Sequence, residues 1–150
     1  MPQSLSCIFV HVVFATRHRV PILSPEIRRG LHKYLAGILR NLGCHVVEIG
    51  GVSDHVHLLI GLSRTSSMAE VIEKVKTGWS KWLKSCGEEF RGFHWQNGYA
   101  AFSVGRSQVD RVARYIVNQE EHHRRYTFQE EYRRFLEHHR VAYDERYVWE

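Results

Sequence analysis

Residues 54–60 read DHVHLLI, and the rest of the chain is arranged around this run. Its residue types favour a β-strand, in which successive side chains point to opposite faces. His55 and His57 therefore share one face, about 7 Å apart along the strand, and the apolar residues between them point toward a core. Two neighbouring imidazoles on a sheet are suited to bind a metal together with further ligands. The alternative is one buried, hydrogen-bonded histidine beside an exposed one, and the pair alone does not decide between them.

The composition is that of one globular domain spanning residues 1–150, with 43% hydrophobic and 25% charged residues. Lysine and arginine total 21 against 16 acidic residues, which gives a net charge of +5. This excess suits a polyanionic partner without proving one.

The cysteines favour a reducing compartment, because Cys7, Cys44 and Cys86 are odd in number and form no Cys-x-x-Cys pair. The start of the chain lacks the layout of a signal peptide, and no apolar run reaches the length needed to span a membrane. We therefore expect a cytoplasmic protein.

Hydrophobic periodicity predicts strands at 7–15, 44–49, 52–62 and 99–104, and helices at 25–42 and 67–86. Gly50 and Gly51 indicate a tight turn that joins the second and third strands into a hairpin. The resulting β-α-β-β-α-β order predicts an α+β, ferredoxin-like (RRM-like) antiparallel sheet with both helices on one face. The open face is then the expected binding site. Two further helices are predicted, one capped by Ser107 and one running from a Thr127 cap to about residue 140.

Several basic side chains are candidate DNA contacts. The end of the first strand carries Arg17 and Arg19, and the helix at 67–86 carries Lys74, Lys76 and Lys81. On their own, such residues more often belong to an ordinary solvated surface, and the functional alternative is contact with backbone phosphates. His11, in the middle of the first strand, is the sixth candidate DNA contact; it is either a core histidine or a neighbour of the His55–His57 pair.

Tyr115 and Gln119 are four residues apart on the first of the two later helices, so they should lie one above the other on one flank. If Gln119 is a third ligand beside His55 and His57, the uncharged set suits Mg²⁺ or Mn²⁺ and leaves positions open for phosphate oxygens. Tyr115 then places a phenol beside the metal, where it could attack a phosphodiester. Tyr126 and Tyr132 lack a ligand at this spacing on a continuous helix.

The chain resembles the single-tyrosine HUH transposases of bacterial insertion sequences and the related REP-associated tyrosine transposases. The resemblance rests on HVVFATRHRVPIL at 11–23, VSDHVHLLI at 52–60, WQNGYAAFSV at 95–104 and YIVNQ at 115–119. It implies a single-stranded DNA endonuclease and strand-transferase in DNA transposition. In such an enzyme Tyr115 forms a 5′-phosphotyrosine link, while His55, His57 and Gln119 hold a divalent ion and no ATP or organic cofactor is needed. It also implies homodimers with active sites completed across subunits, and recognition of subterminal DNA hairpins.

Two other classes remain open. A βαββαβ sheet can be a non-catalytic single-stranded nucleic-acid-binding module, although the third strand offers no aromatic pair for stacking bases. The histidines could also form a structural metal site, although two imidazoles and one amide make a poor closed zinc shell.

Overall fold

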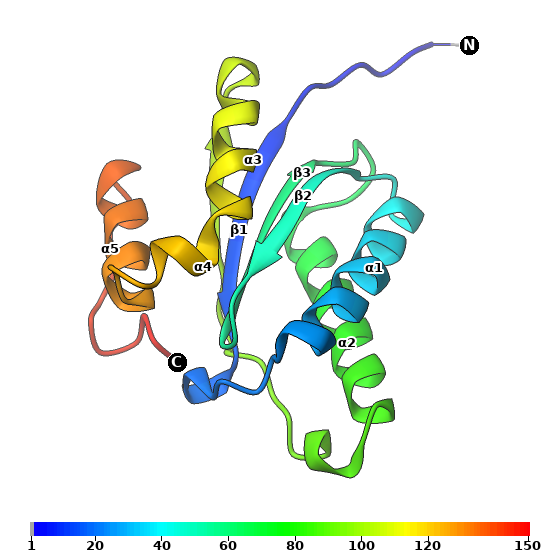
Figure 1. The fold of residues 1–150 in the computed structure, drawn as a ribbon. Helices are drawn as coiled ribbons and strands as arrows, with labels where there is room; N and C mark the ends of the chain where they lie inside the picture. Colours follow the sequence, from blue (N-terminus) through cyan, green and yellow to red (C-terminus); the bar gives the residue numbers. More distant parts are fainter. Residues whose placement is uncertain (1) are drawn as a thin grey trace.

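The structure is a computed structural model that describes residues 2–150 (Figure 1). Its strands are β1 (Phe9–Ala15), β2 (His45–Gly51), β3 (His55–Gly61) and β4 (Ala100–Val104). Its α-helices are α1 (Pro25–Asn41), α2 (Met68–Ser85), α3 (Val109–Val117), α4 (Gln119–His122) and α5 (Phe128–His138). The predicted β-α-β-β-α-β order and the α+β class are confirmed.

The four strands form one antiparallel sheet in the order β2-β3-β1-β4. The strands β1 and β3 occupy its centre, where His57 lies opposite Val13 and His55 opposite Ala15. A central strand has both edges hydrogen-bonded, so the histidine pair is carried on the most firmly held part of the sheet.

Helices α1 and α2 pack on one face of the sheet over the main core, to which β3 contributes Val56, Leu58 and Ile60 as predicted. Both helices begin where their sequences indicate. The Ser24 side chain caps α1, with proline at its first position, and Ser67 and Glu70 form a capping box on α2.

The second face is not open, which corrects the expectation of an uncovered binding surface. Figure 1 shows α3, α4 and α5 lying on the side of the sheet opposite α1 and α2. Ile116 of α3 packs on Leu59, and α5 packs Phe128 and Tyr132 against the β1 and β4 side of the sheet. The histidine pair therefore lies between layers.

Three local predictions were wrong. Gly50 and Gly51 pair within β2, so the turn comes after them. Helix α3 starts at Val109 after a short 3₁₀ turn, and Ser107 does not cap it. The tyrosine helix is not continuous either, because Asn118 adopts φ −93° and ψ 22° between α3 and α4. Within residues 2–150, no helix has the length and apolar character to cross a membrane.

Candidate metal and nucleophile site

His55 and His57 are fully buried, and each ring is held through its Nδ1 atom. The Nδ1 atom of His55 lies 2.7 Å from Asp54 Oδ1, and that of His57 lies 2.8 Å from His11 Nε2. Such partners fix the tautomer and the orientation of a metal-binding histidine. The Nε2 atoms of both rings are thereby turned to a common point. The His55–His57 pair consequently has the arrangement expected of ligands.

His11 is 2% exposed and lies beside the pair, which resolves its two possible roles. Its ring stacks on that of His57 with centroids 5.0 Å apart. Burial and the neighbouring His57 hold the pKa of His11 well below its usual range, so it is neutral and can accept a hydrogen bond. In this conformation it orients His57 and does not reach solvent.

Tyr115 and Gln119 both reach the histidine pair within one chain, despite the break at Asn118. Gln119 Oε1 lies 3.2 Å from His55 Nε2, and the Tyr115 ring centroid lies 6.0 Å from that of His57. Gln119 is buried, whereas Tyr115 is half-buried. Gln119 reaches His55 from the short helix α4 and not from a continuation of α3, as a continuous helix would have required.

The carboxylate of Glu131, on α5, lies at the centre of this cluster and is 2% exposed. Its Oε1 atom lies 3.0 Å from His57 Nε2 and 3.5 Å from His55 Nε2. Its Oε2 atom accepts hydrogen bonds from the Tyr115 hydroxyl and, at 3.1 Å, from Gln119 Nε2. One carboxylate thus links the histidine pair to the tyrosine and the amide.

Two histidines of the α4 segment complete the cluster. His122 Nε2 and His123 Nε2 lie 3.1 and 3.3 Å from Glu131 Oε2, and His123 Nε2 is also 3.0 Å from Gln119 Oε1. The sequence analysis missed these histidines and Glu131. A signal existed, because Glu131 is an acidic residue on the apolar stripe formed by Phe128, Tyr132 and Leu136.

The titration behaviour follows from burying one carboxylate among imidazoles. Burial opposes ionisation of Glu131, but hydrogen bonds from His123, His55 and His57 hold its pKa well below its usual range. Burial also opposes protonation of His55, but Asp54 and Glu131 outweigh it and raise its pKa to about 9. For Tyr115, burial and the Glu131 charge raise the pKa above its ordinary value. The cluster therefore pairs the Glu131 carboxylate with a protonated His55, whose positive charge a metal ion could replace.

A divalent metal fits this donor set. One ligand atom from each of His55, His57, His123 and Glu131 lies within 4.8 Å of all the others, which is compact enough for a single ion. Gln119 Oε1 lies at similar spacing from two of these imidazoles. Imidazole and carboxylate ligands together suit Mn²⁺ as well as the harder Mg²⁺.

Comparison with known proteins identifies the family. The model of the family described as "Transposase IS200 like" matches residues 4–119, most of the chain. This chain belongs to the IS200-like transposase family. The ISDra2 transposase TnpA of Deinococcus radiodurans is 21% identical to it over 114 residues, covering 73% of this chain and 81% of the relative.

Two solved structures share the fold of the transposase. A structure attributed to a transposase of Deinococcus radiodurans R1 has a TM-score of 0.62 at 23% identity, covering 79% of this chain and 98% of that one. A REP-associated tyrosine transposase bound to a REP hairpin has a TM-score of 0.58 at 12% identity, covering 79% of this chain and 69% of that one. The family match ends at Gln119, so His123 and Glu131 lie in a segment that follows it.

The predicted DNA-contacting residues of the transposase are dispersed. Arg17 is exposed and Arg19 half-buried in a 3₁₀ turn after β1, and Arg19 lines a cavity together with Asp54 and His123. Lys74 and Lys81 are exposed on α2, across the sheet from the histidines. Contact between these residues and DNA stays a prediction.

Lys76 on α2 instead binds backbone carbonyl oxygens of the protein itself. It is half-buried, and its ammonium donates to the carbonyl oxygens of Gln96 at 2.7 Å and Gly98 at 2.8 Å. These hydrogen bonds hold the segment that leads into β4. Contact of Lys76 with DNA is therefore less supported than that of the exposed Arg17, Lys74 and Lys81, and the buried His11 is not accessible to DNA either.

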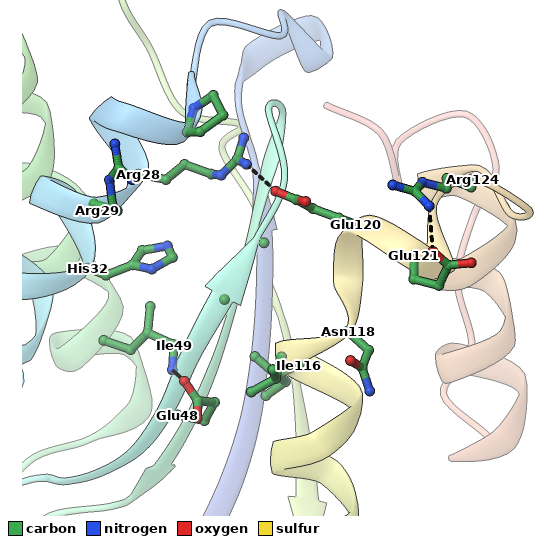
Figure 2. Close-up of a pocket in the computed structure, with 14 residues that line it drawn as sticks. Arg28, Arg29, His32, Glu48, Ile49, Ile116, Asn118, Glu120, Glu121 and Arg124 are labelled. Carbon is green, nitrogen blue, oxygen red and sulfur yellow. Dashed lines mark hydrogen bonds and ion pairs between the residues drawn. The ribbon is translucent and has the colours of Figure 1, made fainter.

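A groove of about 570 Å³ lies between α1 and the α3–α4 break, above the exposed edge of β2 (Figure 2). Arg28 and Glu120 form an ion pair across it at 2.7 Å, which ties α1 to the helix that begins with Gln119. Arg124 is paired with Glu121 at the same distance. Glutamates of the same groove neutralise Arg28 and Arg124, so the groove is less suited to bind a phosphate than its arginines alone would indicate.

Proposed function

We propose that this transposase cleaves and rejoins single-stranded DNA, with Tyr115 as the nucleophile and a divalent ion as cofactor. The observation that supports this best is the convergence of a phenol, an amide, a carboxylate and two oriented imidazoles on one point. Each imidazole is held through Nδ1, so its Nε2 is available to a metal, and the phenol is adjacent. A solely structural cluster would not need a tyrosine hydroxyl at its border.

The Tyr115 oxygen attacks the scissile phosphorus, forming a phosphotyrosine bond and breaking the bond to the 3′ oxygen. The phenol proton passes to solvent as the bond forms, because Glu131, whose pKa lies well below its usual range, is too weak a base to keep it, and the released 3′ oxygen takes a proton up from solvent. The 5′ phosphate stays on Tyr115. Rejoining reverses each transfer when a second 3′ hydroxyl attacks, so the phosphodiester's free energy is retained and no ATP is required.

His55 and His57 would hold the ion through their Nε2 atoms, with Glu131 Oε1 and either Gln119 or His123 as further ligands. When bound, a divalent ion stabilises negative charge on the phosphate and on the leaving oxygen. Glu131 adds a carboxylate to the neutral set expected from the sequence, and this ligand type suits both Mg²⁺ and Mn²⁺.

The deciding experiment is detection of a covalent adduct. The protein is incubated with Mn²⁺ and labelled single-stranded DNA from the ends of its source element, then denatured and resolved by size. Wild type should give an adduct and Tyr115→Phe none, with DNA binding retained. Tyr132→Phe, another buried tyrosine that makes none of these contacts, should still give one. An unchanged adduct with Tyr115→Phe assigns the nucleophile elsewhere.

Three wider parts of the proposal come from the family. They are a homodimer with active sites completed across subunits, recognition of subterminal hairpins, and a cytoplasmic location, nucleoid-associated when acting on DNA. The neighbour bound to a REP hairpin supports the second. Mixing Tyr115→Phe with His57→Ala tests the first, because only exchange of tyrosine helices between subunits would restore an adduct.

A second candidate function is a purely structural metal site. The four ligand atoms of His55, His57, His123 and Glu131, three of them from buried residues, make a more complete shell than the sequence indicated. This alternative predicts that metal stabilises the fold but that no protein–DNA adduct ever forms, so the same assay separates the two.

A further inference from the structure

A second cleft, of about 330 Å³, borders Tyr115 on the side away from the Arg28–Glu120 groove. It lies between the edge strand β4 and the helices α3 and α5. We call it the β4–α3–α5 cleft, and its main lining residues are Phe102, Gly105, Arg111, Tyr115, Phe135 and His139. The half-buried Tyr115 side chain forms part of its wall, so a substrate strand can approach Tyr115 along the cleft.

One wall of the cleft is built from nearly parallel rings. The Phe102 ring lies 5.4 Å from Phe135 at 23° and 4.7 Å from His139 at 21°. Phe135 and His139 are half-buried, so part of this wall remains accessible. Flat aromatic walls are the surfaces on which proteins stack bases of single strands, independently of sequence.

The charge of the cleft suits a phosphate. No acidic side chain lines it, and within residues 2–150 its exposed arginine, Arg111, takes part in no ion pair. In the other groove, by contrast, Arg28 and Arg124 are both neutralised by glutamates (Figure 2). Arg111 is therefore a guanidinium in this cleft that is free to bind an anion.

Helical spacing relates Arg111 to the nucleophile. The two residues are four apart on α3, so Arg111 lies one turn before Tyr115 on the same flank, with the two Cβ atoms about 6 Å apart. That separation is on the scale of one nucleotide of a single strand. A phosphate held by Arg111 would thus neighbour the phosphate that Tyr115 attacks.

We propose that the β4–α3–α5 cleft binds the nucleotide next to the scissile phosphate, with its base against Phe135 and His139 and its phosphate against Arg111. The proposal rests on the proposed function, because it takes Tyr115 as the nucleophile. It adds a defined subsite for single-stranded DNA, formed partly by α5, a helix that follows the family match.

Gly105 allows the cleft to be filled without disturbing the backbone. A Cβ atom built there has no neighbour within 4 Å, and the residue adopts φ −68° and ψ 147°, which any side chain tolerates. Gly105→Trp should occupy the cleft while the protein stays folded. Gly92→Trp is the matched control, since Gly92 is also exposed and open but lies on a distant loop.

The test measures binding of a short fluorescein-labelled oligothymidylate to the full chain in EDTA, where no cleavage occurs. Gly105→Trp should weaken binding about tenfold or more, on the scale of one lost stacking contact, and Gly92→Trp should not. Arg111→Ala should reduce the slope of log affinity against log salt by about 1. Arg114→Ala, an exposed arginine on the same helix outside the cleft, should leave this slope unchanged.

The outcomes separate this proposal from the proposed function. Wild-type affinity and salt dependence in both Gly105→Trp and Arg111→Ala would overturn the subsite, even if wild type still forms the Tyr115 adduct. Weakened binding in these variants with no adduct under any condition would keep the cleft as a DNA site and overturn the nuclease. Arg111→Ala keeps the test decisive if Gly105→Trp fails to fold.

Discussion

The Nε2 atom of His11 lies 2.8 Å from the Nδ1 atom of His57, between the two central strands of the sheet. Both rings are buried, and the neutral His11 can only accept the proton of His57 Nδ1 if His57 is to present Nε2 to a metal. This contact therefore selects the tautomer of His57, the candidate ligand. His11, which makes the contact from β1, is not itself one of the candidate ligands.

We predict that His11→Phe weakens Mn²⁺ binding by roughly 10- to 100-fold, the usual effect of removing the partner of a metal-bound histidine. Phenylalanine fills the space but accepts no hydrogen bond. Calorimetric titration of the metal-free protein measures the affinity. His45→Phe, on the exposed start of β2, is the control. Equal affinities in wild type and His11→Phe would show that His57 is not oriented by this contact.

Glu131→Gln should reduce the rise in melting temperature that Mn²⁺ produces, because it removes the only buried carboxylate of the cluster while keeping its shape. Glu130→Gln changes the exposed neighbour and should retain the full rise. Thermal unfolding with and without Mn²⁺ gives the measurement. If Glu131→Gln responds to Mn²⁺ as wild type does, the ion is held by His55, His57, Gln119 and His123 without a ligand from α5.

Gly50→Ala should displace α3 from the sheet, since a Cβ atom at Gly50 would lie 2.6 Å from the carbonyl oxygen of Ile116. Overpacking of this kind costs about 1–3 kcal/mol, and the shift would move Tyr115 away from the cluster. Gly37→Ala, in an open position of α1, should instead stabilise by about 0.5–1 kcal/mol. Urea unfolding and the adduct assay test both variants; a fully active Gly50→Ala protein would mean that α3 tolerates the displacement.

His32 should make stability depend on pH. It lies in the groove of Figure 2, where burial and Arg28 lower its pKa from 6.5 to about 4. The charged groups facing it are Arg28 and Arg29 of α1, Glu48 of β2, and Glu120, Glu121 and Arg124 of the α4 segment. Between the two pKa values the unfolded chain binds more protons, so His32 contributes a loss of stability as pH falls from 6.5 toward 4.

His32→Gln should therefore flatten the pH dependence of the free energy of unfolding in this range. The exposed His94 provides the control, and His94→Gln should follow wild type. Urea unfolding at a series of pH values gives the comparison. Identical curves for wild type and His32→Gln would show that the ring is solvated in solution.

Much of the fold was predictable because its signals are local. Alternation along 54–60 placed His55 and His57 on one face, and the caps at Ser67 and Thr127 started α2 and α5 where the sequence indicated. The turn predicted at Gly50 and Gly51 was wrong, because Gly50 is needed for the close approach of Ile116 and not for a turn. That requirement comes from a helix distant in sequence, which no local pattern records.

The sequence by itself indicated the β-α-β-β-α-β order and the two imidazoles on one face, since both follow from the periods of strands and helices, and it singled out Tyr115 and Gln119 as candidates. Only the tertiary structure decided that α3, α4 and α5 cover the histidine face, that Asn118 breaks the tyrosine helix, and that Glu131 enters the cluster. The physical reason is the separation in sequence between the residues that interact. Periodicity specifies which side of an element is apolar, whereas the partner of a buried charge is set by packing between elements that lie 74 residues apart, as His57 and Glu131 do.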